Sequence, residues 1–194
     1  MKFSDVVFNK SIALQSQDIM FENKKEIIFV GRSNVGKSSI MNSIFEKKDL
    51  VKTSSRPGKT KTANIFTVAN KYWLTDLPGY GFAKMWKTFQ EQLDGLISWY
   101  IEERASHIQA VVILIDSRIW AGQGDIDMYK YLLELELPIK IVLSKTDKIS
   151  KSELAKVTQK VKNDFFGQEI LPVSSLKKTG VHELTKSLKQ ALLS

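Results

Sequence analysis

The segment 31–38, with the sequence GRSNVGKS, constrains the fold of this chain more than any other segment. It matches the pattern G-x-x-x-x-G-K-[ST] without a gap, and that pattern needs a strand before it and a helix after it. The apolar run 27–30 predicts a buried strand, and residues 38–45 have the spacing of an amphipathic helix. A strand, a glycine turn and a helix in this order predict a phosphate-binding loop in an α/β fold.

The chemistry of this loop follows from its residue types. The glycines allow a tight turn in which successive backbone N–H groups face phosphate oxygens, and the helix N-terminus adds a partial positive charge. Lys37 can reach the β- and γ-phosphates, and the Ser38 hydroxyl can bind Mg²⁺. The alternative is a glycine turn that binds nothing. The residues predicted to contact the nucleotide are Gly31, Arg32, Ser33, Asn34, Val35, Gly36, Lys37 and Ser38.

Strand and helix patterns alternate along the rest of the chain, and this alternation predicts a three-layer α/β sandwich with a mostly parallel sheet of about six or more strands. We expect one domain over 1–194, in which residues 1–25 add an edge strand or wrap the sheet. The predicted strands are 63–68, 72–75, 110–115, 138–143 and 169–173, and the predicted helices are 89–104, 125–135, 152–165 and 181–193.

Composition excludes several classes of protein and favours a polyanionic partner. Without cysteine the chain has no disulfides or thiolate metal sites, and no apolar stretch reaches the ~18 residues that span a bilayer, so we expect a cytoplasmic protein. The net charge of +8 favours nucleic acid over a membrane, although a lysine-rich surface that only keeps the protein soluble is the alternative. Lysine supplies most of this charge, which favours contacts with RNA backbone over reading of base sequence.

The segment 76–79, with the sequence DLPG, follows the predicted strand 72–75. Ligands of open α/β sheets bind at the carboxyl ends of the strands, so this turn belongs to the same site as the phosphate loop. Asp76 can hold Mg²⁺ through a water molecule, and the Gly79 N–H can contact a γ-phosphate. The residues assigned to this contact are Asp76, Leu77, Pro78 and Gly79.

The segment 144–147, with the sequence SKTD, follows the strand 138–143 and predicts which base is bound. Guanine presents N1–H and an amino group side by side, two donors for the Asp147 carboxylate, whereas adenine presents an acceptor there and is rejected. The Lys145 stem can lie over the base. The predicted base-recognition residues are Ser144, Lys145, Thr146 and Asp147.

A third loop, 174–176, follows the last predicted strand, 169–173. Its backbone N–H groups can meet the guanine O6. Small residues are common in such loops, so this is the weakest of the four signals. The residues concerned are Ser174, Ser175 and Leu176.

These motifs in this order resemble those of translation-factor-class GTPases. They resemble most closely the EngB family (also called YsxC or YihA), bacterial GTPases of large-ribosomal-subunit assembly within the TrmE-Era-EngA-EngB-septin-like superfamily. The segments that carry the closer resemblance are 31–39 (GRSNVGKSS), 55–60 (SRPGKT), 76–84 (DLPGYGFAK) and 176–180 (LKKTG). The resemblance covers nearly the whole chain and implies a P-loop GTPase domain that binds GTP or GDP with Mg²⁺.

The resemblance also implies two switch segments. Switch I covers 58–62, where Thr60 matches the Mg²⁺-binding threonine of the family and Thr62 is its neighbouring competitor. Switch II covers Gly79 to about Lys87, and its aromatic residues either contact a partner or pack under the loop. The switch I residues are Gly58, Lys59, Thr60, Lys61 and Thr62, and the switch II aromatic residues are Tyr80, Phe82 and Trp86.

The residue after Gly79 bears on hydrolysis, because Ras-like GTPases have a water-orienting glutamine there. This chain has Tyr80, so we expect slow intrinsic hydrolysis that a partner, backbone groups or a monovalent cation completes. Asn34 matches an asparagine that ligates K⁺ in related GTPases, and the alternative is a side chain that stabilises the loop. By resemblance, the residues of the catalytic step are Lys37, Thr60, Gly79 and Asn34.

The function expected from these residues is a Mg²⁺-dependent GTP switch. By resemblance its partner is the large ribosomal subunit precursor, with its rRNA and ribosomal proteins, and the family is linked to cell division and septation. One alternative is a GTPase that acts directly on a cell-division protein, and another is an ATP-using P-loop enzyme, against which Asp147 argues. We expect a monomer that does not bind membranes.

Overall fold

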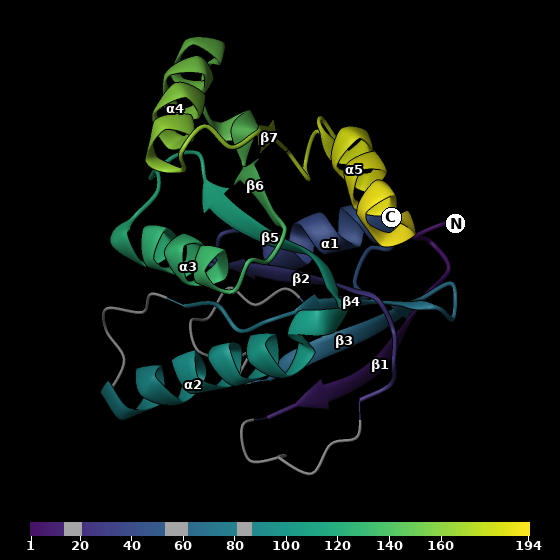
Figure 1. Ribbon diagram of the computed structural model, residues 1–194. Helices are drawn as coiled ribbons and strands as arrows, with labels where there is room; N and C mark the ends of the chain where they lie inside the picture. Colours follow the sequence, from purple (N-terminus) through teal and green to yellow (C-terminus); the bar gives the residue numbers. More distant parts are fainter. Residues whose placement is uncertain (14–20, 53–61, 81–86) are drawn as a thin grey trace.

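The computed structural model describes residues 1–13, 21–52, 62–80 and 87–194, and contains one seven-stranded sheet with helices on both faces (Figure 1). The strand order is β1-β3-β4-β2-β5-β6-β7. The strands are β1 (Val6–Ile12), β2 (Glu26–Gly31), β3 (Ala63–Val68), β4 (Tyr72–Asp76), β5 (Ile108–Asp116), β6 (Ile139–Ser144) and β7 (Ile170–Pro172). The helices are α1 (Lys37–Phe45), α2 (Lys87–Arg104), α3 (Gln123–Glu134), α4 (Lys151–Asp164) and α5 (Val181–Leu193), with short 3₁₀ turns at Ala105–His107 and Thr146–Lys148.

The sheet is mostly parallel. Strands β4, β2, β5, β6 and β7 run parallel to one another, whereas β3 pairs antiparallel with both β4 and β1. The β3–β4 pair is the hairpin that the short connection 69–71 produces, and β1 forms the outer edge next to β3. The predicted α/β sandwich is therefore confirmed.

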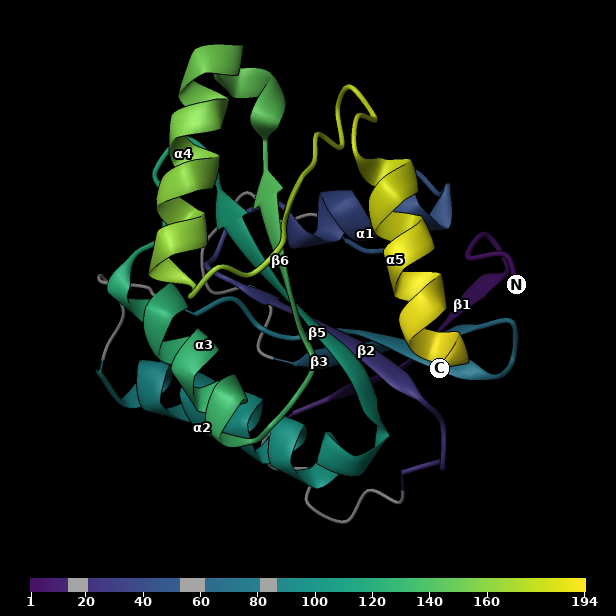
Figure 2. The same cartoon turned by 45° about the horizontal axis from the view of Figure 1, so that its top comes forward.

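The two faces of the sheet carry separate hydrophobic cores, because alternate side chains of each strand point to opposite faces. Ile28 and Val30 of β2 pack toward α2, α3 and α4, in a core that includes Tyr100, Leu132 and Val161. Ile27 and Phe29 of the same strand pack toward α1 and α5, in a core built on residues such as Phe45 and Leu188. Figure 2 shows α1 and α5 side by side on one face, with α2 and α3 below the sheet. 

A buried ion pair fixes the end of α2 against the start of β2. Arg104 Nε donates to Glu26 Oε2 at 2.9 Å, and both side chains are almost fully buried. The Tyr100 hydroxyl donates to Glu26 Oε1 at 2.6 Å, and the Thr75 hydroxyl donates to the same oxygen. Because this network lies at the amino end of β2, it supports the fold at the end away from the phosphate loop.

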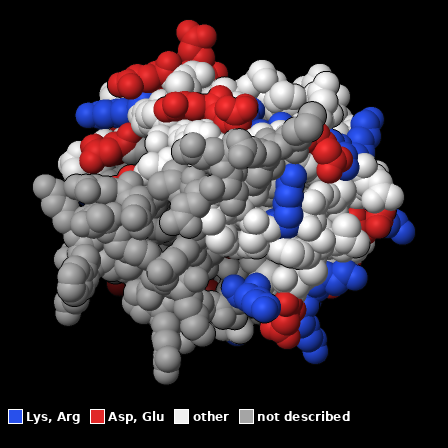
Figure 3. Space-filling model, turned by 90° about the horizontal axis from the view of Figure 1, so that it is seen from below, with Lys and Arg blue, Asp and Glu red and all other residues white. Residues whose placement is uncertain are grey.

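The face in Figure 3 carries both signs of charge. In its described part, lysine and arginine side chains alternate with aspartate and glutamate side chains. This part of the face therefore shows no continuous basic patch, although the chain carries a net charge of +8.

Candidate nucleotide-binding site

The phosphate loop joins β2 to α1 in the manner that its sequence predicts. Gly36 occupies the N-cap position of α1 with φ at +107°, a left-handed conformation that a side chain would strain. The helix begins at Lys37 and runs to Phe45. The first backbone N–H groups of this helix lie next to the loop, which is the arrangement that binds anions.

Lys37 and Asp76 form the charged centre of the site. Lys37 is only 9% exposed, and its Nζ lies 3.5 Å from the Gly31 carbonyl oxygen. Burial lowers the pKa of the Lys37 ammonium, while the negative charge of Asp76 opposes that shift. Burial likewise raises the pKa of the Asp76 carboxyl, against the opposing effect of Lys37. Phosphate oxygens beside Lys37 would supply the negative charge that a buried ammonium needs.

The residues beside this centre fit a magnesium ion. The Ser38 hydroxyl donates to Asp76 Oδ2 at 3.3 Å, so one hydroxyl and one carboxylate face each other. Asp76 Oδ1 is buried and has no hydrogen-bond partner among the described residues. A buried carboxylate oxygen without a partner is costly, and Mg²⁺ prefers oxygen ligands of this kind.

The turn after β4 lies directly against the phosphate loop. The Ser33 N–H donates to the Tyr80 carbonyl oxygen at 3.2 Å. A Cβ atom on Gly79 would lie 2.8 Å from Ser33 Cα and 2.9 Å from Ser33 N, closer than side chains approach backbone. The close packing of these two loops therefore requires glycine at position 79.

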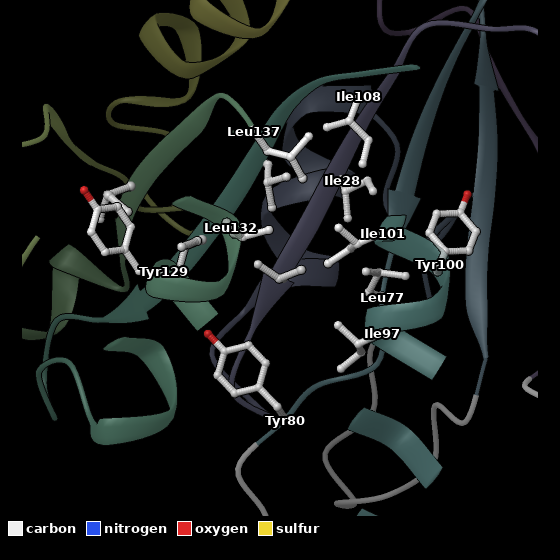
Figure 4. Close-up of a cluster of buried hydrophobic side chains, with 14 of the residues drawn as sticks. Ile28, Leu77, Tyr80, Ile97, Tyr100, Ile101, Ile108, Tyr129, Leu132 and Leu137 are labelled. Carbon is white, nitrogen blue, oxygen red and sulfur yellow. The ribbon is translucent and has the colours of Figure 1, made fainter. Parts of the chain in front are cut away.

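Tyr80 is buried, not presented to a partner. Its ring packs in the core beneath α2 and α3, and Figure 4 shows it among Leu132, Ile97 and Leu77. Its hydroxyl donates to Asp125 Oδ1 at 2.9 Å. Of the two expectations for the switch II aromatic residues, packing under the loop holds for Tyr80, whereas Phe82 and Trp86 lie outside the described residues.

Asp125, which sequence reasoning missed, ties Tyr80 to the start of α3. Its Oδ2 accepts the Gly122 N–H at 2.9 Å, and the side chain is fully buried. Burial raises the pKa of the Asp125 carboxyl, and the hydrogen bonds from Gly122 and Tyr80 oppose that shift. The available sequence signal was an aspartate three residues after Gly122, which is a pattern typical of a helix start. The second partner of Asp125, Tyr80, lies 45 residues away along the chain.

Removal of the Tyr80 hydroxyl leaves a buried carboxylate oxygen without its donor. We expect Tyr80→Phe to lower the free energy of unfolding by about 1–3 kcal/mol, measured by urea titration. The matched control is Tyr131→Phe, because the Tyr131 hydroxyl donates at 2.8 Å to Glu102, which is solvent-exposed. We expect that control to change the free energy of unfolding by less than about 0.5 kcal/mol. Equal losses in the two variants would contradict the assigned role of the buried bond.

The predicted base-recognition loop contacts the phosphate loop through two side chains. The Ser144 hydroxyl donates to the Val35 carbonyl oxygen at 2.7 Å, and Lys145 Nζ donates to the Asn34 carbonyl oxygen at 2.6 Å. Lys145 has φ at +57°, and its hydrogen bond to Asn34 brings its stem across the phosphate loop. Asn34 is exposed with φ at +61°, a conformation that asparagine tolerates better than most residues.

Asp147 lies beside the third predicted loop. The Ser174 hydroxyl donates to Asp147 Oδ1 at 2.6 Å and itself accepts the Lys177 N–H at 3.0 Å. The hydrogen bond from Ser174 lowers the pKa of the Asp147 carboxyl, so this group stays ionised at neutral pH. Thr146 N–H donates to the Val173 carbonyl oxygen at 3.4 Å, which joins the two loops a second time.

The structure thus brings together the phosphate loop, the segment 76–79, the segment 144–147 and Ser174. Ser175 is half-buried and Leu176 is exposed in the same loop as Ser174. Thr62 lies just before β3, and its hydroxyl donates to Asn64 at 3.3 Å. The other switch I predictions, Gly58, Lys59, Thr60 and Lys61, lie outside the described residues.

Comparisons with known proteins agree with this arrangement. The family model described as "50S ribosome-binding GTPase" matches residues 26–145. The "Probable GTP-binding protein EngB" of Petrotoga mobilis is 42% identical over 179 residues, which cover 91% of this chain and 90% of that protein. Its counterpart from Clostridium kluyveri is 41% identical over 174 residues, 88% of each chain.

The chain belongs to the EngB family of GTP-binding proteins. The crystal structure of a probable GTP-binding protein EngB superposes with a TM-score of 0.73 at 26% identity, covering 86% of this chain and 98% of that one. Era from Aquifex aeolicus, solved with GDP·AlF₄⁻, shares the fold with a TM-score of 0.69 at 22% identity, covering 86% of this chain and 56% of Era. The predicted family is therefore confirmed, and the chain carries a GTPase domain.

None of the helices in the described ranges has the length and apolar character needed to cross a bilayer.

Proposed function

We propose that this protein is a Mg²⁺-dependent GTP switch in assembly of the large ribosomal subunit, needed for normal cell division and septation. One observation carries the proposal. The phosphate loop, the pair Ser38 and Asp76 that fits Mg²⁺, and an ionised Asp147 lie together at the carboxyl ends of the parallel strands. The description of the matching family model as ribosome-binding and the net charge of +8 support an RNA-containing partner. In this proposal the protein acts as a monomer in the bacterial cytoplasm.

In this proposal each side chain has a task set by its surroundings. Lys37 and the N–H groups of the loop bind the phosphates, and Ser38 with Asp76, through a water molecule, would hold Mg²⁺. The ion neutralises phosphate charge when bound. Asp147 accepts the two guanine donors, and Ser174 fixes the direction of one carboxylate oxygen. By resemblance Thr60 adds a ligand to Mg²⁺ in the GTP state.

The proposed switch follows from the contact between Gly79 and the phosphate loop. The γ-phosphate would sit next to Ser33 and Gly79, where the Ser33 N–H now donates to the Tyr80 carbonyl oxygen and a Cβ atom on Gly79 would have no room. Entry of that phosphate group would move the turn 76–79, and Tyr80 would carry the movement toward α3 through Asp125. GTP and GDP would then give the switch segments two arrangements with different affinities for a partner.

Slow intrinsic hydrolysis is part of the proposal. The side chain that follows Gly79 is an aromatic ring whose hydroxyl already donates to Asp125, so it does not point at a water molecule near the phosphate. The missing water-orienting group must come from a partner, from backbone or from a monovalent cation.

The cation route makes a prediction about Asn34. If its exposed side chain ligates K⁺, GTP hydrolysis will be severalfold faster in KCl than in NaCl, and Asn34→Ala will remove the difference. The measurement is phosphate release at constant ionic strength in the two salts. Equal rates in both salts, unchanged in Asn34→Ala, would contradict the cation route and leave Asn34 as a residue suited to its left-handed turn.

Co-sedimentation with ribosomal subunits tests the partner. The protein is mixed with small or large subunits in GDP, in a non-hydrolysable GTP analogue or without nucleotide, at two salt concentrations. We expect large-subunit binding that requires the GTP analogue and persists at the higher salt. Binding that is equal in all nucleotide states and disappears with salt would mean nonspecific charge attraction. It would redirect the search to protein partners at the division site.

A further inference from the structure

Asp116 is a buried charged residue that the site described so far does not use. It ends β5, which lies between β2 and β6, the strands that lead into the phosphate loop and the base-recognition loop. In the sheet register Asp116 pairs with Ser144, the residue directly before Lys145. Its side chain is 4% exposed. A carboxylate in this position can contact both loops that would enclose a nucleotide.

The Asp116 carboxylate is fully engaged by two cations. Arg118 donates from Nε to Oδ1 at 3.0 Å and from Nη2 to Oδ2 at 2.8 Å, and its backbone N–H donates to Oδ1 at 3.0 Å. Lys145 Nζ donates to Oδ2 at 2.8 Å. Burial acts to raise the pKa of the Asp116 carboxyl, but the hydrogen bonds from Arg118 and Lys145 outweigh burial and lower the pKa to about 2. The group is therefore an anion throughout the physiological range.

The Lys145 ammonium is held by two acceptors in this arrangement. Its Nζ donates to Asp116 on one strand end and to the Asn34 carbonyl oxygen, at 2.6 Å, on the phosphate loop. A Cβ atom on Gly36 would lie 3.7 Å from Lys145 Cε, so the stem runs along the loop at van der Waals distance. A lysine side chain has many rotamers, and two acceptors on one ammonium select a single path for the stem.

We propose that Asp116 is a positioning residue for nucleotide binding, which holds the Lys145 ammonium so that its stem forms the surface on which the guanine ring lies. The proposal rests on the proposed role of Lys145 in the base site. Asp116 does not touch the nucleotide. It acts through Lys145, and it links the phosphate loop to the base-recognition loop through the same ammonium.

This role has a signature that separates it from base reading. The lysine stem contacts the face of the purine ring, whereas Asp147 contacts the edge where purines differ. Inosine diphosphate lacks the exocyclic amino group of GDP. Loss of Asp116 must therefore weaken the binding of GDP and of inosine diphosphate by the same factor. Loss of Asp147 must change the ratio of the two affinities.

The test is a double-mutant cycle measured by calorimetric titration of GDP and inosine diphosphate into Asp116→Asn, Lys145→Ala and the double variant. We expect Asp116→Asn to raise both Kd values about tenfold, as loss of one charge-assisted hydrogen bond does. In the Lys145→Ala background the same change should have almost no further effect. Asp164→Asn is the matched control, because Asp164 is a partly exposed aspartate at the end of α4 that pairs with Lys160, and it should leave both Kd values unchanged.

Additive effects of the two substitutions, or a lower melting temperature with unchanged Kd values, would overturn the proposal and make Asp116 a purely structural residue. If Lys145→Ala itself left both Kd values unchanged, the proposed base site would fail together with this inference. If Asp116→Asn does not fold, Asp116→Glu keeps the charge and moves the carboxylate by one methylene. Asp116→Glu should then weaken the binding of both ligands equally, and unchanged Kd values in this variant would also overturn the proposal.

Discussion

Asp147→Asn is expected to weaken GDP binding by at least about a hundredfold and to give the protein a preference for xanthosine diphosphate. Guanine offers two donors to a carboxylate, whereas an amide presents one acceptor and one donor and matches the carbonyl that xanthine carries in place of the amino group. The Ser174 hydroxyl at 2.6 Å holds Asp147 Oδ1 in a fixed direction, so the amide will take the same position. Competition between the two diphosphates measures the change.

Two controls separate base reading from general damage to the site. Asp164→Asn makes the same chemical change at a partly exposed position in α4 and should leave the preference for GDP intact. Ser174→Ala should weaken GDP binding to a smaller extent without favouring xanthine, because the carboxylate remains. If Asp147→Asn weakened both diphosphates equally, Asp147 would support the loop without reading the base, and the preference for guanine would need another source. Failure of ADP to compete with GDP for the unaltered protein, measured in the same assay, would exclude the ATP-using alternative.

The sequence predicted those helices and strands that show a local pattern of apolar and polar residues. The segment 63–68 was predicted as a strand and is β3 with the same bounds, and 181–193 was predicted as a helix and is α5. Continuous apolar runs gave the central strands, whose two buried faces need no alternation. The edge strand β1, with the sequence VVFNKSI, has no such pattern and stayed one of two alternatives for residues 1–25.

Partners far apart along the chain could not be predicted in this way. Glu26 and Arg104 are 78 residues apart, and each alone has the residue type of an exposed charge, yet both are buried as a pair. Tyr80 and Asp125 are likewise joined across 45 residues. Asp116 had a local signal, an acidic residue at the end of an apolar strand next to the predicted site. Only the sheet order, with β5 between β2 and β6, shows that it reaches Lys145.

Lys37→Met is expected to reduce GTP and GDP affinity by at least about a hundredfold, because it removes the only charge-bearing group of this side chain at the phosphates. Methionine keeps an unbranched apolar chain, so the packing of the stem under the loop changes little. The measurement is titration with both nucleotides in Mg²⁺. Lys160→Met is the matched control, because Lys160 is an exposed lysine paired with Asp164 and should bind nucleotide as the unaltered protein does.

The stability of Lys37→Met without nucleotide separates a binding role of Lys37 from a structural one. Burial lowers the pKa of the Lys37 ammonium in the folded protein, so at neutral pH the charged form is less favourable folded than unfolded, and Asp76 compensates only in part. Replacing the ammonium removes this cost but leaves the buried Asp76 carboxylate without its countercharge. Because these two effects oppose each other, we expect the melting temperature of the nucleotide-free protein to change little while nucleotide affinity collapses. Loss of affinity without a matching loss of stability would show that nucleotide binding needs the ammonium. A large fall in melting temperature together with retained GTP binding would show instead that Lys37 is structural and that the phosphates are held by the loop backbone alone.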